Sequence, residues 1–154
     1  MSGGPRFYDS GSYIAPKFSS ISVLTAGGAG DNVAVVGASI DRMGFGSSAV
    51  AVTYSATLAA AATLSITVQR EQSDDGTTWE AATTVLPAQV VATGPGGGGT
   101  VRGEVKLRES YETAARFVRY SVTPNLSASA TDTASVACTV VLGGAFNGTS
   151  LPLS

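Results

Sequence analysis

The chain has 154 residues, a length that suits one domain with one hydrophobic core. Charged residues make up only 13% of it, and nine basic against eleven acidic residues give a net charge of −2. Because no basic run is present to neutralise a phosphate backbone, a nucleic-acid partner is not expected. Gly, Ala, Ser, Thr and Val dominate instead, and this composition is typical of strands and turns.

Several function classes are excluded by absent features. Asp31 and several glycines interrupt the apolar segment of residues 23–40, so no stretch is long enough to span a membrane. The first residues lack the basic and then apolar order of a secretory signal, which predicts a protein made in a cytoplasm and kept there or released by lysis. Histidine is absent, so Ser-His and Cys-His catalysis is excluded, and neither an enzyme, a cofactor nor a metal is expected.

The N-terminal residues 1–17 are polar and show no periodicity, which predicts an extended arm. We expect its aromatic residues Phe7, Tyr8 and Tyr13 to act as anchors on a neighbouring protein. The predicted domains are this arm, a β-sandwich domain of residues 18–146 and a C-terminal tail of residues 147–154.

The first half of the predicted sandwich begins with a strand at residues 18–24 and a loop at residues 25–32. An apolar run follows at residues 33–40. Strict alternation of apolar and polar side chains then predicts a strand at residues 50–58. The four alanines after it have no helix caps and are predicted to be a connection.

A hairpin is predicted next, because residues 64–69 alternate and the sequence SDDGT at residues 73–77 has the composition of a tight turn. The return run, residues 79–85, opens with Trp79, the only tryptophan. We interpret this side chain as packing in the hairpin or the core.

The second half contains a Gly-rich loop at residues 93–99 and a strongly amphipathic strand at residues 101–108. A short helical turn at residues 109–115 precedes a strand at residues 117–123, which Pro124 is expected to end. The last strand, residues 134–142, is expected to end at Gly143 and Gly144, and its Cys138 is expected to be a buried thiol. Seven or eight strands with turns between them predict an all-β, antiparallel β-sandwich or jelly roll.

Three groups of residues are candidates for a catalytic or binding site. Asp74 and Asp75 are interpreted as turn formers, with a carboxylate pair or a weak Ca²⁺ site as the alternatives. The letters of a dinucleotide fingerprint at residues 44–49 lack a preceding strand and a following helix, which favours a turn. A small basic-aromatic patch of Arg116, Arg119 and Tyr120 is weighed against an ordinary solvated strand face.

Four stretches together resemble small virion proteins of tailed bacteriophages, in particular capsid decoration (cement) proteins. They are TAGGAGDN, SITVQREQSDDGTTWEAA, RFVRYSVTPNLSASATDTASVACTVVLGG and its Gly-Gly end, and the likeness covers most of residues 20–144. The resemblance implies a structural virion protein on the outer capsid surface, commonly a homotrimer, that stabilises the shell by bridging major capsid proteins. It implies no catalytic residue, and the arm lies outside it.

An alternative function is a carbohydrate-binding or host-surface-binding module of a phage head or tail fibre. Such a site uses stacking aromatics and polar groups on one exposed face. Trp79 is the candidate residue, although few aromatic residues lie near it in the sequence.

Overall fold

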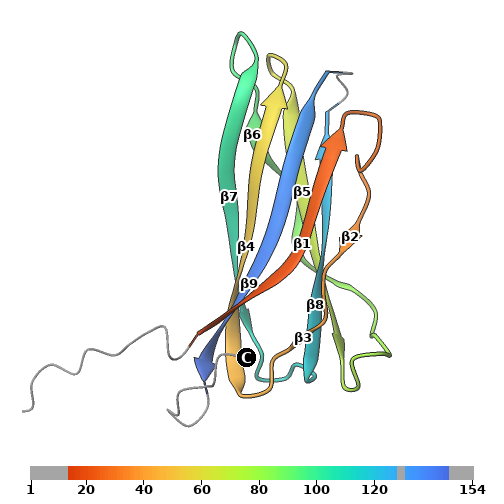
Figure 1. Ribbon diagram of the computed structural model, residues 1–154, viewed down its shortest axis with the longest axis vertical. Helices are drawn as coiled ribbons and strands as arrows, with labels where there is room; N and C mark the ends of the chain where they lie inside the picture. Colours follow the sequence, from red (N-terminus) through yellow and green to blue (C-terminus); the bar gives the residue numbers. More distant parts are fainter. Residues whose placement is uncertain (1–13, 128–130, 146–154) are drawn as a thin grey trace, which may run out of the picture.

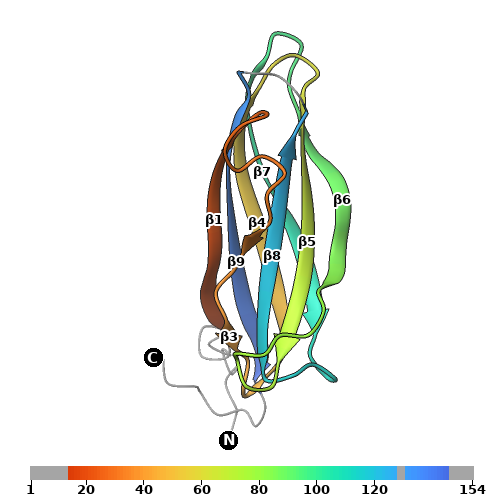
Figure 2. The same ribbon diagram turned by 90° about the vertical axis from the view of Figure 1, so that its right-hand side faces the viewer.

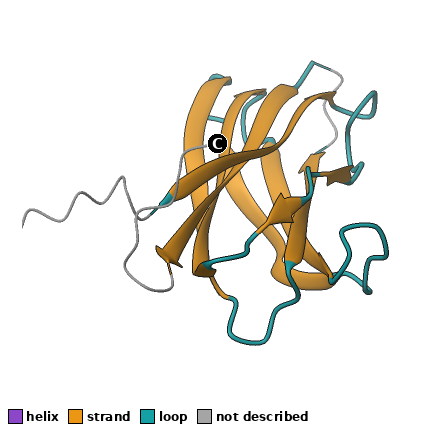
Figure 3. Cartoon of the chain, turned by 60° about the horizontal axis from the view of Figure 1, so that its bottom comes forward, coloured by secondary structure: helices purple, strands orange, loops and turns teal. Residues whose placement is uncertain are grey.

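The computed structural model describes residues 14–127 and 131–145, which form antiparallel strands joined by loops (Figure 3). Within these residues no helix is long and apolar enough to cross a membrane. The strands are β1 (Ala15–Thr25), β2 (Val35–Val36), β3 (Ile40–Asp41), β4 (Phe45–Leu58), β5 (Thr63–Ser73), β6 (Thr83–Thr93), β7 (Gly99–Ser110), β8 (Phe117–Leu126) and β9 (Thr133–Ala145).

The strands build two sheets that pack face to face (Figures 1 and 2). Sheet A has the order β1-β9-β4-β7, and sheet B has the order β2-β8-β5-β6, with β3 also paired to β8. Because β2 and β3 share one partner, they act as a single interrupted strand. The pairs are then nested, β1 with β9, β2 and β3 with β8, β4 with β7, and β5 with β6, like a long hairpin rolled up. This is the topology of a jelly roll, and the predicted all-β fold class is confirmed.

The core lies between the two sheets and is built by the alternation that the sequence shows. Every second residue of β4, β5, β8 and β9 points inward, because successive side chains of a strand lie on opposite faces. The largest fully buried side chains are Tyr111, Tyr120, Leu24, Leu58, Leu64, Ile66, Leu142, Val50, Val52, Val68, Val118 and Val140.

Two predicted strand boundaries are wrong because the strands extend beyond the residues whose apolar and polar side chains alternate. β1 begins at Ala15, so residues 15–17 of the expected arm belong to the sandwich. β6 continues through Pro87 to Thr93, and the predicted return run at Trp79 lies mostly in the loop before it. Pro87 is tolerated because β6 is an edge strand with several irregularities in its pairing to β5.

Pro124 does not end its strand, because β8 continues to Leu126. The carbonyl oxygen of Pro124 accepts a hydrogen bond from the N–H of Asn32, at 2.9 Å. In a strand, the N–H and the carbonyl of one residue point to the same side, so an N–H at position 124 would also face the side of Asn32. Because β2 does not extend this far along β8, proline at this position costs no hydrogen bond between strands.

Three further predictions also fail at strand ends. β9 continues through Gly143 and Gly144, whose φ of 65° marks an irregularity where the strand pairs with the start of β4. Residues 45–49 of the dinucleotide letters are strand rather than turn, although Gly44 before them has a φ of 88° in a turn. β7 runs to Ser110, so the expected helical turn reduces to one bond from the N–H of Ala114 to the carbonyl of Tyr111.

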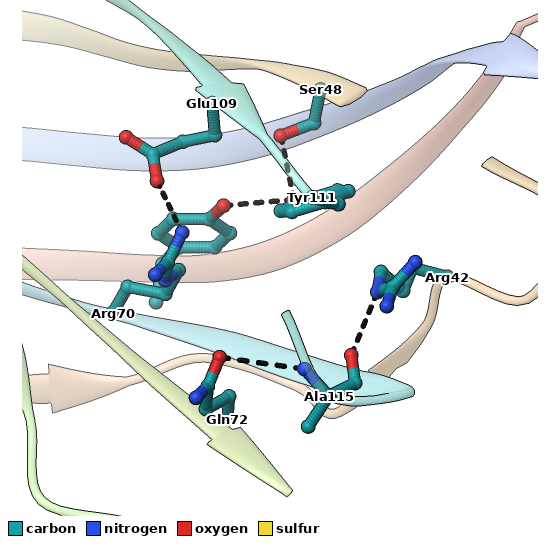
Figure 4. A network of polar contacts seen from close by, with 8 residues as sticks. Arg42, Ser48, Arg70, Gln72, Glu109, Tyr111 and Ala115 are labelled. Atoms are coloured by element: carbon teal, nitrogen blue, oxygen red, sulfur yellow. Dashed lines mark hydrogen bonds and ion pairs between the residues drawn. The ribbon is translucent and has the colours of Figure 1, made fainter. Parts of the chain in front are cut away.

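A polar network ties the two sheets together at the end of the sandwich where β4 begins and β7 ends (Figure 4). The hydroxyl of Tyr111 lies 2.6 Å from the hydroxyl of Ser48 and 2.8 Å from that of Tyr120. Beside it, Arg70 of β5 donates to the carboxylate of Glu109 on β7 at 2.7 Å. Burial raises the pKa of Tyr111 and keeps its phenol protonated.

The loop after β7 is fixed by the same network. Arg42 donates to the carbonyl oxygen of Ala115 at 2.7 Å and also to that of Ala114, while its guanidinium lies over the ring of Tyr111. The amide oxygen of Gln72 accepts from the N–H of Ala115 (Figure 4). Side chains of β5 and of the segment before β4 therefore hold the β7–β8 loop in place.

Candidate functional site

The residues expected to make contacts from the N-terminal arm, Phe7, Tyr8 and Tyr13, lie outside the described residues. The tail of residues 147–154 lies outside them as well. The other residues that the sequence singled out are all described, and their positions decide between the interpretations given above.

Asp75 is a turn former, as predicted. Its Oδ1 accepts hydrogen bonds from the N–H groups of Thr77 and Thr78, at 2.8 and 2.7 Å, and from the hydroxyl of Ser73. These donors favour the charged form and hold the pKa of Asp75 well below its usual range. In the described part of the chain no group of three or more His, Cys, Asp and Glu side chains is placed to hold a metal ion.

Trp79 packs at the surface and not in the core, which corrects one of the two roles expected for it. Its ring lies over the guanidinium of Arg119, 4.1 Å from the ring centroid, on the outer face of sheet B. Arg119 in turn donates to both oxygens of Glu71, its cross-strand neighbour, at 2.7 and 3.2 Å. This stack fixes the β5–β6 loop onto sheet B.

The basic-aromatic patch is not formed. Arg116 makes an ion pair with Asp41 at 2.6 Å and lies over the ring of Phe117, and Arg119 is held by Glu71. Tyr120 points into the core and is fully buried. Both cations are therefore paired, and the aromatic side chain lies on the opposite side of β8.

The buried cysteine is confirmed. Cys138 is 1% exposed between the sheets, and burial raises the pKa of its thiol. A protonated thiol without access to solvent is unreactive, so it offers no chemistry.

The outer face of sheet A is the most distinctive surface of the described molecule. We call it the A face; Figure 1 looks onto it, with β7, β4, β9 and β1 from left to right. The strand registers arrange its side chains in five rungs of four. In the order β1, β9, β4, β7 they are Pro16-Val141-Ala49-Arg108, Phe18-Thr139-Ala51-Lys106, Ile21-Ala137-Thr53-Glu104, Val23-Ser135-Ser55-Arg102 and Thr25-Thr133-Thr57-Thr100.

The middle of the A face is a floor of small uncharged side chains. Every position that β9 and β4 contribute to the five rungs is Ala, Ser, Thr or Val. Short side chains without charge leave the floor low and cost less to dehydrate than charged groups, provided that its hydroxyls keep hydrogen-bond partners. Two hollows lie in it, one of about 310 Å³ beside Ala49 and Val141 and one of about 240 Å³ beside Thr53 and Ser135.

Two rows of larger side chains border this floor. On β1 the apolar row consists of Phe18, Ile21 and Val23, which are 64%, 60% and 70% exposed. On β7 the charged row consists of Arg102, Glu104, Lys106 and Arg108. Ile14, which directly precedes β1, adds a further exposed apolar side chain beside the larger hollow.

The size and composition of the A face suit contact with another macromolecule. With strands about 4.8 Å apart and rungs about 6.8 Å apart, five rungs of four residues cover on the order of 600 Å². A standard protein interface buries roughly 600–1,000 Å² on each partner, so the face is large enough for a specific contact. An apolar row next to an uncharged floor is typical of such contacts rather than of a face that stays in water.

This surface is not evident from the sequence. The apolar row consists of residues 18, 21 and 23, so its first two members are three residues apart and not two. The cause is a shift of register between Phe18 and Ser20 in the pairing of β1 with β9. The shift interrupts the period of two, so the three residues do not read as one face. A signal was present in β4 and β9, where the polar rows contain no charged residue.

Comparisons with solved structures find the same fold in chains from infectious bursal disease virus. A structure of the Gx strain matches with a TM-score of 0.52 and 8% identity over 89% of this chain. The VP2 subviral particle matches with a TM-score of 0.51 and 8% identity over 88% of this chain. The T13 viral particle matches with a TM-score of 0.52 and 9% identity over 89% of this chain. The match spans about a third of the length of those chains, 34%, 34% and 32% respectively.

No family model matches the chain, and no curated protein matches it in sequence. At 8–9% identity the structural likeness shows the fold alone. The chain therefore has an all-β, jelly-roll fold of two antiparallel sheets that is also found in virus particles, and this likeness does not single out the tailed-phage decoration proteins.

Proposed function

We propose that this protein is a structural component of a bacteriophage virion that decorates the outer surface of the capsid and stabilises it by bridging neighbouring major capsid proteins. The observation that carries the proposal is the A face, an uncharged floor with an exposed apolar row that is large enough for a specific protein contact. A protein that works by contact needs such a surface and no catalytic group.

Two further observations support the proposal. The first is the resemblance that we interpret in four stretches of the sequence, which points to tailed-phage virion proteins although no family model and no curated protein matches the chain. The fold is shared with chains from infectious bursal disease virus particles, which makes a role in a virion consistent with the architecture.

Assembly as a homotrimer and anchoring by the arm belong to the same proposal. The arm contributes Phe7, Tyr8 and Tyr13, and aromatic side chains of this kind often dominate the energy of a contact. Replacing all three by Ala is expected to weaken capsid binding without lowering the melting temperature. Unchanged binding would show that the arm is not an anchor, and native mass spectrometry of the purified protein tests the trimer.

The direct experiment mixes the purified protein with expanded capsids that lack it and measures co-sedimentation against protein concentration. We expect saturable binding, with a fixed number of copies per capsid, and a higher melting temperature of the decorated capsid. Failure to bind at saturating concentration would reject the proposal.

A carbohydrate-binding function is the second candidate, because Trp79 lies at the surface and not in the core. One face of its ring is occupied by Arg119, so only the rest of the ring is available for stacking on a sugar. Glycan-array binding that disappears in Trp79→Ala, with the melting temperature retained, would favour this function over decoration of a capsid.

A further inference from the structure

We infer that the A face is the surface through which the protein meets its partner, and that the partner presents an uncharged apolar patch bordered on one side by carboxylates. The inference rests on the proposed function, in which the partner is the major capsid protein. It adds which face makes the contact, how the molecule is oriented, and what chemistry the partner surface has.

The apolar row identifies the face. Eight large apolar side chains are exposed in the described chain, and four of them, Ile14, Phe18, Ile21 and Val23, lie on β1 or directly before it. The other four are Val33 and Val36 at or just before β2, Met43 before β4, and Val90 on β6. A contiguous apolar row beside a floor of small side chains gains free energy when another apolar surface covers it.

The charged row defines the other side of the contact. Arg102, Lys106 and Arg108 against Glu104 give this row a charge of +2, while the whole chain carries −2, so the remainder carries −4. Glu104 is already paired with Lys106 at 2.6 Å, which leaves the two arginines at the ends of the row without a carboxylate partner in the described structure. This row is therefore more positive than the rest of the chain taken together, and an acidic surface attracts it.

A second copy of the chain does not complement both the apolar row on β1 and the charged row on β7. If two A faces meet about a twofold axis that runs across the strands, β1 lies on β1 and β7 on β7, and two rows of charge +2 face each other. If the axis runs along the strands, the apolar row of each copy lies on the cationic row of the other. Only a different surface, apolar opposite β1 and acidic opposite β7, complements the whole face.

The first test uses the full-length protein and expanded capsids that lack it, and it compares two single substitutions of similar exposure. Val23, 70% exposed, lies in the apolar row, and Val90, 55% exposed, lies on the edge strand of the other sheet. We expect Val23→Lys to weaken binding about tenfold or more, as at a contact hot spot, and Val90→Lys to leave it within about twofold of wild type. Melting temperatures of both variants establish that the fold is retained.

The second test changes charge by the same amount on two surfaces. Arg102→Gln with Arg108→Gln and Ala88→Glu with Gln89→Glu each lower the net charge by two, on β7 and on β6 respectively. We expect only the first pair to weaken binding at low salt and to make binding less dependent on salt. Tighter binding by the first pair would show that the partner is not acidic and would overturn the inference.

The outcomes separate this inference from the proposed function. If wild type binds capsids and the β1 and β7 variants bind equally well, the A face is not the contact, although the decoration function stands. If wild type does not bind capsids at all, the decoration function fails. If sedimentation shows a wild-type dimer that Val23→Lys abolishes, the face is covered by a second copy, and the inference is wrong.

Discussion

Gly94 shows how a single residue fixes the end of the sandwich where the β6–β7 loop passes the β4–β5 turn. A Cβ at Gly94 collides with the carbonyl oxygen of Ala59 and comes within 3.1 Å of the Cβ of Leu58. Gly94 also exchanges backbone hydrogen bonds with this turn, from its N–H to Ala62 and from Ala61 to its carbonyl. We expect Gly94→Ala to lower the free energy of unfolding by about 1–3 kcal/mol, measured by urea denaturation.

A control for this substitution lies in the same loop. A Cβ at Gly96 meets no atom within 4 Å, and the residue has no positive φ. Gly96→Ala is therefore expected to leave stability unchanged or slightly raised, since alanine restricts the unfolded chain. Equal effects of the two substitutions would contradict the assigned contact with Ala59.

Asp75 makes the stability of the β5–β6 loop depend on pH. Its pKa is lowered in the folded protein by the N–H groups of Thr78 and Thr77, whereas an unfolded aspartate has a pKa of about 3.9. A lowered folded pKa stabilises the fold above the unfolded pKa, and this contribution is lost as pH falls below about 4.

The measurement is the free energy of unfolding of wild type and Asp75→Asn between pH 7 and pH 3. We expect the variant to be less stable at pH 7 and the difference to shrink below about pH 4. Asp74→Asn is the control, because Asp74 accepts no hydrogen bond among the described residues. A difference that does not change with pH would rule out the carboxylate as its source.

At the scale of elements, the hydroxyl group of Tyr111 connects the two sheets. Tyr111→Phe leaves the buried hydroxyls of Ser48 and Tyr120 without their shared partner. We expect a loss of about 1–3 kcal/mol in the free energy of unfolding, measured by chemical denaturation. Ser65→Ala, at a half-buried site on the outer face of β5, is the control, and an equal loss there would show that the Tyr111 network has no special role.

Most strands could be predicted from the sequence because their inward rows are apolar and strictly alternate. Residues 50–58, 101–108 and 134–142 fall inside β4, β7 and β9, and their burial follows the predicted period. The strand ends could not be predicted, since Pro87 and Pro124 are accommodated where no ladder bond is needed, and that depends on which strands are neighbours.

The candidate surface could not be predicted for a related reason. Its five rungs join side chains from four strands that are distant in the sequence, and only the sheet order brings them together. Trp79 shows the same limit, because its stacking on Arg119 requires the β5–β6 loop to fold back over β8. Sequence patterns report which face of a strand is buried, but not which outer faces lie side by side.

In the whole molecule, a jelly roll of two sheets, most of the polar groups that the sequence singled out are engaged by neighbouring residues. Cys138 is buried, the carboxylate of Asp75 is engaged by its own turn, and Arg116 and Arg119 are paired. The A face, in contrast, exposes an apolar row and a cationic row on opposite sides of an uncharged floor. This arrangement underlies the proposal that the protein acts by attaching to the shell of a virion.

The most direct test is the amount of this chain in purified virions, measured by quantitative mass spectrometry against the major capsid protein. A decoration protein occupies equivalent positions on a symmetric shell, so the decoration proposal predicts a fixed stoichiometric ratio that stays constant through repeated density-gradient purification. Absence of the chain from virions, or a trace amount that falls with each purification step, would contradict it.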